Sequence, residues 1–113
     1  MINFELLRKT ALAFPEASEE PHFDKTSFRV KKKIFATYNR IEHRACIKLS
    51  AIDQHVFCQI QKELIYPVNN KWGKQGWTLV NLQHVDEAIF MDALTTAYCN
   101  VAPPNLAQII RPK

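Results

Sequence analysis

The sequence predicts an α/β domain in which helices flank an antiparallel sheet. Segments with apolar residues at helical spacing stand at both ends of the chain, and short runs with alternating apolar and polar residues lie between them. The chain has 113 residues, of which 47% are hydrophobic, and this suffices for one core. We therefore expect a single domain over residues 1–113.

The first helix is expected to begin after Asn3, a favourable N-cap, and to run to about Ala13. Its apolar stripe consists of Phe4, Leu7 and Ala11. It ends at Phe14-Pro15 because the residue before a proline is disfavoured in helical conformation. The acidic segment 16–24 is predicted to be irregular, with Pro21 interrupting any continuation.

Three short strands are expected next, at Phe28–Val30, Ile34–Tyr38 and Arg44–Leu49. If their apolar sides face the core, Arg29, Arg44 and Lys48 project from the opposite face of the sheet. The connectors 31–33 and 39–43 would then be hairpin tips.

A second helix is expected from Ser50, where Ser50 and Asp53 resemble a capping box. Its predicted apolar stripe consists of Ile52, Val56, Phe57 and Ile60. A short strand at Leu64–Pro67 and a last strand at Trp77–Leu82 follow.

The third helix, from about Asp86 to Val101, has the clearest pattern in the chain. Asp86 and Glu87 suit its positive N-terminal end. Its apolar stripe consists of Ile89, Ala93, Leu94, Ala97, Tyr98 and Val101. Prolines at 103–104 end it, and Asn105–Ile110 is expected to add a short helical turn.

The positive charge is concentrated in one part of the chain. The segment Arg29–Lys48 contains seven basic residues and one acid, which gives it a net charge of +6, whereas the whole chain has +4. Such a patch attracts polyanions. A solvated face that only keeps the protein soluble is the alternative.

Residues 69–80 combine both tryptophans, both glycines and two lysines, in the order NNKWGKQGWTLV. Glycine permits tight turns, and a lysine beside an indole places a cation next to a π face. We interpret this segment as a contact loop for a phosphate-bearing partner. Trp77, at the start of an apolar strand, is expected to be a core or sheet-covering residue.

The residues do not assemble into a catalytic motif. The histidines His22, His43, His55 and His84 lie on different predicted elements, and none has a recognised metal spacing. The cysteines Cys46, Cys58 and Cys99 form an odd set without a CxxC pair. We therefore expect a protein that is not an enzyme and has no cofactor, metal site or disulfide. Without a signal peptide or a membrane-spanning run, it is expected in the cytoplasm.

Taken together, several of these features resemble the MmcQ/YjbR family over about residues 4–101. They are the helix ending in Phe14-Pro15, Lys33-Ile34-Phe35-Ala36, Ile47-Lys48-Leu49, Lys71 followed by Trp77, and a helix ending near Tyr98. The resemblance implies a two-layer fold akin to the CyaY/frataxin arrangement and a predicted DNA-binding function with a double wing. The turn that often holds glycine in that family is all lysine here, and Ala97 replaces a common serine.

By position, the resemblance implies that the two wings are Lys31–Lys33 and the Lys71–Lys74 loop. Lysines there would contact phosphates of duplex or single-stranded DNA without reading sequence, and Trp72 would stack on a base or pack against a sugar. Packing of Trp72 within the protein itself is the alternative. The predicted nucleic-acid-binding residues are Arg29, Lys31, Lys32, Lys33, Arg40, Arg44, Lys48, Lys71, Trp72 and Lys74. The first helix lacks the acidic ridge that iron binding by a frataxin-like protein would need.

The alternative function is a protein-interaction module that does not bind nucleic acid. The acidic segment 16–24 would then bind a protein partner, or fold over the basic patch and neutralise it. Homodimerisation through a sheet edge is also open.

Overall fold

Residues 1–112, which the computed structural model describes, form a six-stranded antiparallel sheet and five helices, and the predicted fold class is confirmed. The elements are α1 (Phe4–Leu12), β1 (Ala17–His22), β2 (Lys25–Val30), β3 (Lys33–Asn39), β4 (Arg44–Lys48), α2 (Ala51–Ile60), β5 (Ile65–Pro67), α3 (Lys71–Lys74), β6 (Trp77–Asn81), α4 (Glu87–Val101) and α5 (Pro104–Ile110).

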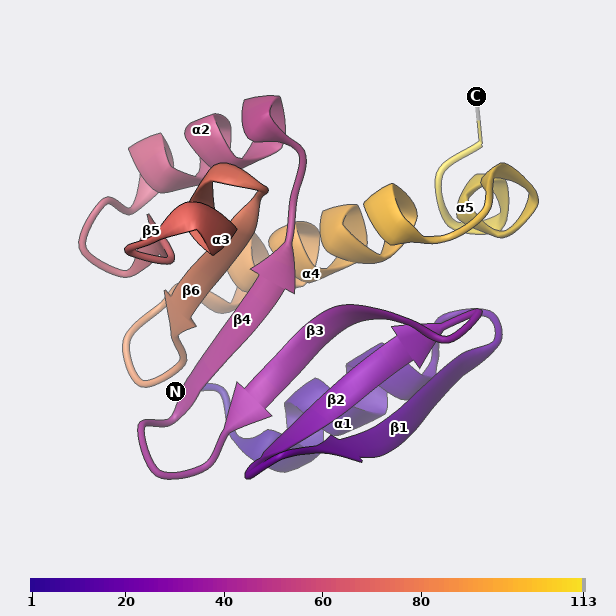
Figure 1. The fold of residues 1–113 in the computed structure, drawn as a ribbon, viewed down its shortest axis with the longest axis horizontal. Coiled ribbons are helices and arrows are strands. Elements are labelled where there is room, and N and C mark those ends of the chain that lie inside the picture. The colour runs from indigo at the N-terminus through magenta and orange to yellow at the C-terminus, as the bar shows by residue number, and fades with distance from the viewer. Residues whose placement is uncertain (113) are drawn as a thin grey trace.

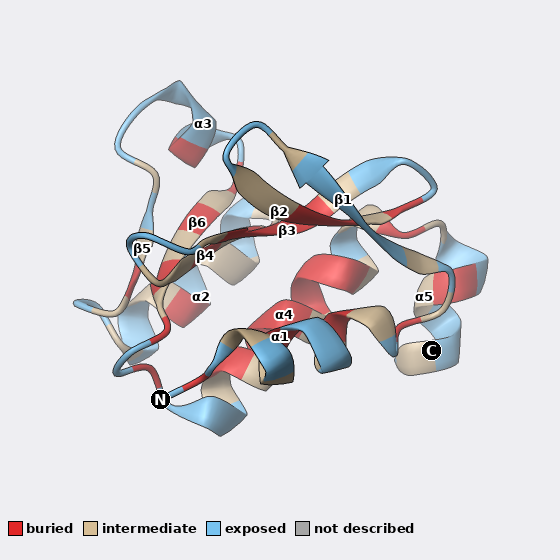
Figure 2. Cartoon of the chain, turned by 90° about the horizontal axis from the view of Figure 1, so that it is seen from below, coloured by how far each residue is buried: buried red, intermediate tan, exposed pale blue. Residues whose placement is uncertain are grey.

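The strands are ordered β1-β2-β3-β4-β6-β5, so β1 and β5 are the edges. Helices α1 and α4 lie behind the sheet in Figure 1. Figure 2 shows the same two helices on one side of the sheet and α3 on the other. One face of the sheet is therefore covered by α1 and α4, and we call the other the open face.

The core lies between the sheet and these helices. Alternation along the strands directs one set of side chains inward, because successive residues of a strand point to opposite faces. Phe28, Val30, Ala45 and Ile47 are fully buried in this way. Phe14 stacks on Tyr98 of α4 at 4.7 Å between ring centroids, which joins the end of α1 to α4.

The predicted helix starts are confirmed at the residues that carry them. The side chains of Asn3, Ser50 and Asp86 each accept a hydrogen bond from a backbone N–H three residues later. The short C-terminal helix is also present, as α5. No helix in the span from residue 1 to 112 is long and apolar enough to cross a bilayer.

The prediction that segment 16–24 is irregular is wrong, because residues 17–22 form the edge strand β1. It pairs with β2 from Ala17 opposite Val30 to His22 opposite Lys25. Pro21 is tolerated because an edge strand has one side that needs no partner for its N–H. The strand was missed because four consecutive residues in it, 18–21, are exposed, so it has no apolar alternation.

The predicted apolar stripe of α2 is also wrong in part. Phe57 is buried, whereas Ile52, Val56 and Ile60 are 77%, 48% and 52% exposed. Helical spacing was correct, but the helix turns only one of these residues toward the core.

Candidate nucleic-acid interface

The side chains of the open face are those that alternate with buried residues along neighbouring strands of the sheet. Arg44, Cys46 and Lys48 alternate with the buried Ala45 and Ile47 on β4, so all three point away from the core. On β2, Arg29 lies between the buried residues Phe28 and Val30. The expectation that Arg29, Arg44 and Lys48 share one face therefore agrees with the strand pairing.

Each of these three cations has a partner within the protein. Arg29 donates to the Ser27 hydroxyl at 3.0 Å and lies 3.8 Å from the carboxylate of Glu20. Arg44 donates to the Tyr66 hydroxyl at 3.0 Å, and this bond, helped by the nearby carboxylate of Glu42, raises the pKa of Arg44.

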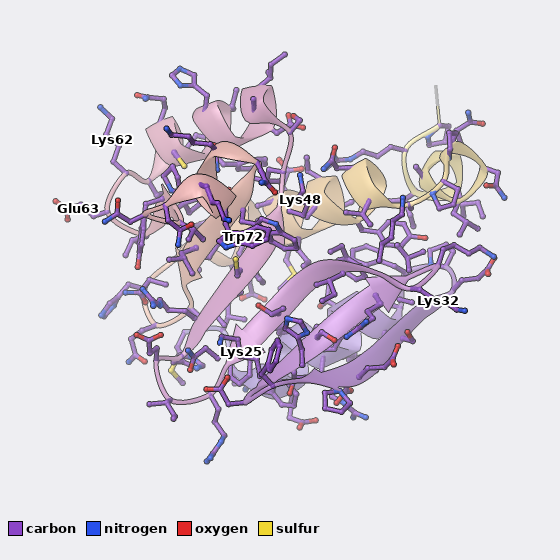
Figure 3. The ribbon with its side chains drawn as sticks, in the orientation of Figure 1. Lys25, Lys32, Lys48, Lys62, Glu63 and Trp72 are labelled. Carbon is purple, nitrogen blue, oxygen red and sulfur yellow. The ribbon has the colours of Figure 1, made fainter. Side chains whose placement is uncertain are left out.

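The ammonium group of Lys48 donates to the carbonyl oxygen of Gln75. A residue of β4 is thereby connected to the segment that follows α3. Figure 3 shows Lys48 close to Trp72 in this view.

The first predicted wing, Lys31–Lys33, is the turn between β2 and β3. Lys31 and Lys32 have φ angles of 50° and 70°, in the left-handed region that favours glycine or asparagine. Lys31 pairs with Glu16 at 2.7 Å, while all three lysines are exposed. Figure 3 shows Lys32 at the opposite end of the molecule from α3.

The second predicted wing is not an irregular loop, because α3 forms within it. Asn70 caps this short helix by accepting from the N–H of Trp72 at 2.8 Å. Lys71 lies 5.4 Å from the centroid of the Trp72 ring, a cation–π distance. Trp72 is 49% exposed.

Gln54 is a positioning residue that the sequence interpretation missed. From α2, its amide nitrogen lies 2.9 Å from the carbonyl oxygen of Gly73 and 3.0 Å from the Thr78 hydroxyl. Both glycines of the segment serve close packing. A Cβ on Gly73 would lie 1.9 Å from the carbonyl oxygen of Val68, and Gly76 has a φ of 104°.

Arg40 lies apart from the wings, in the turn between β3 and β4. It lines a shallow hollow of about 310 Å³ together with Phe4, Phe23 and Tyr38. A second hollow, of about 450 Å³, lies between α2 and residues 69–76, which contain α3 and which we call the α3 segment. Lys71 and Lys74 line this hollow together with Gln54. The hydrogen bond from Lys48 to Gln75 thus joins one end of β4 to the α3 segment. Arg44 lies at the other end of β4, beside the turn that carries Arg40, and the first wing lies at the opposite end of β3 from that turn.

Two acids of the segment 16–24 lie next to cations of the basic patch: Glu20 of β1, and Glu16, which precedes β1. Glu16 pairs with Lys31 and Glu20 approaches Arg29. The carboxylates of these pairs are half exposed, and exposed ion pairs contribute only about 0 to 1 kcal/mol.

The cysteine, histidine and acidic side chains, which could act as nucleophiles or metal ligands, do not come together in one site. Burial raises the pKa of the Cys46 thiol to about 11, so this thiol is protonated at neutral pH. Tyr38 and His43 share a hydrogen bond of 3.0 Å at the end of β3. Among the 112 residues described, no three His, Cys, Asp or Glu side chains gather closely enough to hold a metal ion.

Comparison with known proteins identifies relatives by sequence and by fold. The model of the YjbR family matches residues 12–100 of this chain. The crystal structure of the Deinococcus radiodurans protein DR2400, described with the family domain DUF419, matches with a TM-score of 0.76. It is 21% identical, and the match covers 86% of this chain and 76% of that chain. No curated protein matches the sequence.

Proposed function

We propose that this chain, which belongs to the YjbR family, binds nucleic acid without reading its base sequence. The contact surface would be the open face of the sheet with the two lysine-bearing segments, Lys31–Lys33 and Lys71–Lys74. The observation that supports this most is that Arg29, Arg44 and Lys48 project from the face that α1 and α4 leave uncovered.

The chemistry of these side chains suits phosphate. Ammonium and guanidinium groups that neutralise phosphates release counterions, and this supplies sequence-independent affinity. Contacts of this kind set the position of the protein on the nucleic acid and carry no base information. The proposed role is thus binding rather than catalysis.

The test is fluorescence anisotropy with labelled DNA of two unrelated sequences. If about four phosphates are contacted, raising the salt from 50 to 200 mM weakens binding roughly a hundredfold, and equally for both sequences. Affinity that does not respond to salt, or binding of one sequence only, would contradict the proposal.

A double variant, Lys31→Asn with Lys32→Gly, tests the first wing without unfolding it. The Asn-Gly pair suits the positive φ angles of this turn, so two charges are removed while the turn is kept. The slope of log affinity against log salt should become shallower by about two. The matched control is Lys9→Ala with Lys62→Ala, two exposed lysines outside the open face, which should leave the slope unchanged.

A second candidate function is a protein-interaction module, which the exposed stripe Ile52, Val56 and Ile60 on α2 favours. Contacts at such a stripe are apolar and so respond little to salt. Sedimentation velocity of the parent and of Val56→Glu tests self-association here. A dimer that persists in high salt and is lost in the variant would favour this candidate.

A further inference from the structure

The open face carries an apolar and aromatic strip that phosphate contacts leave unused, and we infer that this strip stacks unpaired bases. The bound nucleic acid would then be single-stranded. The inference rests on the proposed function and specifies its substrate class. The strip consists of Trp72, Tyr66, Leu79, Cys46 and Trp77.

The strand register assembles the strip from three strands. Leu79 of β6 is opposite Tyr66 of β5 on one side and opposite Cys46 of β4 on the other. Trp77 precedes Leu79 by two residues and so shares its face. The neighbours Thr78 and Val80 are fully buried on the core side, and all four members of the strip in the sheet are partly exposed.

Trp72 adds a half-exposed indole above the same face. Helix α3 lies on the open side of the sheet in Figure 2, opposite to α1 and α4. The hydrogen bond from Gln54 to the carbonyl oxygen of Gly73 holds the residue next to Trp72. The indole is thus presented by an anchored backbone, which lowers the entropy lost when a ring stacks on it.

Cations border the strip on both sides. Arg44 and Lys48 stand two residues before and two residues after Cys46 on β4, about 7 Å away along the strand in each direction. Lys71 lies beside Trp72. The margins of the strip are therefore positively charged and suit phosphates, while its centre is apolar and suits bases.

This arrangement matches an unpaired strand better than a duplex. The bases of a duplex are stacked inside it, so a duplex presents mainly phosphates and groove edges to a flat surface. An unpaired strand presents base faces together with phosphates, and base faces stack on aromatic side chains irrespective of sequence. Only the single strand uses both parts of the surface.

The experiment compares three ligands of about 12 nucleotides, a length within the site sizes of single-strand binders. They are a mixed-sequence strand, its blunt duplex, and an abasic strand with the same phosphates. Binding is followed by quenching of tryptophan fluorescence at low salt and by anisotropy of an end label. The variants are Trp72→Ala and, as a matched control on α2, Ile52→Ala, which also removes an exposed apolar side chain that is not part of the strip.

We expect the normal strand to bind about tenfold more tightly than either the duplex or the abasic strand. Trp72→Ala should lower affinity for the normal strand by a similar factor and leave abasic binding unchanged, whereas Ile52→Ala should change neither. Equal binding of normal and abasic strands, or tighter binding of the duplex, would overturn the inference while the proposed function stands. If none of the three ligands binds, the proposed function fails as well.

Discussion

The side-chain amide of Gln54 lies 2.9 Å from the carbonyl oxygen of Gly73 and joins α2 to the α3 segment. The same nitrogen lies 3.0 Å from the hydroxyl of Thr78 and 3.3 Å from the carbonyl oxygen of Trp77. A primary amide has two N–H groups, so it can serve two of these acceptors at a time. Gln54 therefore joins α2 both to the residue that follows Trp72 and to the start of β6.

Replacing Gln54 with Ala should lower the free energy of unfolding by about 1 to 2 kcal/mol, because buried acceptors lose their donor. Urea denaturation measures this change, and acrylamide quenching should show a more accessible Trp72. Gln59→Ala is the matched control, since Gln59 is exposed on the same helix. If both variants are as stable as the parent, Gln54 does not anchor the segment.

Gly73 should tolerate no side chain, because an added Cβ would lie 1.9 Å from the carbonyl oxygen of Val68. Relief requires movement of the backbone, so we expect Gly73→Ala to destabilise the fold by about 2 to 4 kcal/mol. Lys74→Ala, one residue later and exposed, should stay within about 0.5 kcal/mol of the parent. Thermal or urea unfolding measures the stability of both variants. If Gly73→Ala is as stable as the parent, the backbone around Val68 can move to accept a side chain.

The lysine turn should be a site where stability can be gained. Lys31 and Lys32 both adopt positive φ, which costs a residue with a Cβ about 1 to 2 kcal/mol relative to glycine. The double variant Lys31→Asn with Lys32→Gly should therefore raise the free energy of unfolding by about 1 kcal/mol or more. The exposed pair between Lys31 and Glu16 is lost, but it contributes little.

Lys33→Gly is the contrasting variant, because Lys33 begins β3 and its φ is not positive. Glycine there should lower stability by about 0.5 to 1 kcal/mol. If urea denaturation shows a gain in the free energy of unfolding for the double variant and a loss for Lys33→Gly, backbone strain at Lys31 and Lys32 is the cause of the gain. The same sign for both would contradict it.

Structural features that depend on only a few neighbouring residues could be predicted from the sequence. Asn3, Ser50 and Asp86 begin helices because a side-chain oxygen needs only a backbone N–H three residues away. Strand β1 could not be predicted, because it is held by pairing with β2 rather than by an apolar pattern of its own. The exposure of Ile52 depends on what packs against α2, and helical periodicity does not contain this information.

The positions of the cations in the candidate site could be predicted from the sequence, whereas the apolar and aromatic strip between them could not. Alternation along β4 suffices to place Arg44 and Lys48 on one face. Tyr66 and Leu79 become neighbours only through the pairing of β5 with β6, a relation between strands that are separated along the chain by α3. Gln54 has no sequence signal, because its three acceptors come from a helix and a strand that fold back onto α2.

Cys46 should make the stability of the protein fall at alkaline pH. Burial raises the pKa of its thiol from 9.0 to about 11, so between these values the folded state keeps a proton that the unfolded state has lost. Stability from this group is therefore fully present below pH 9 and is lost as the pH rises toward 11. The full loss is on the order of 3 kcal/mol. Urea denaturation of the parent and of Cys46→Ala over this range isolates the effect, because other titrating groups are common to both. Parallel profiles would show that the thiol titrates alike in the folded and unfolded chains.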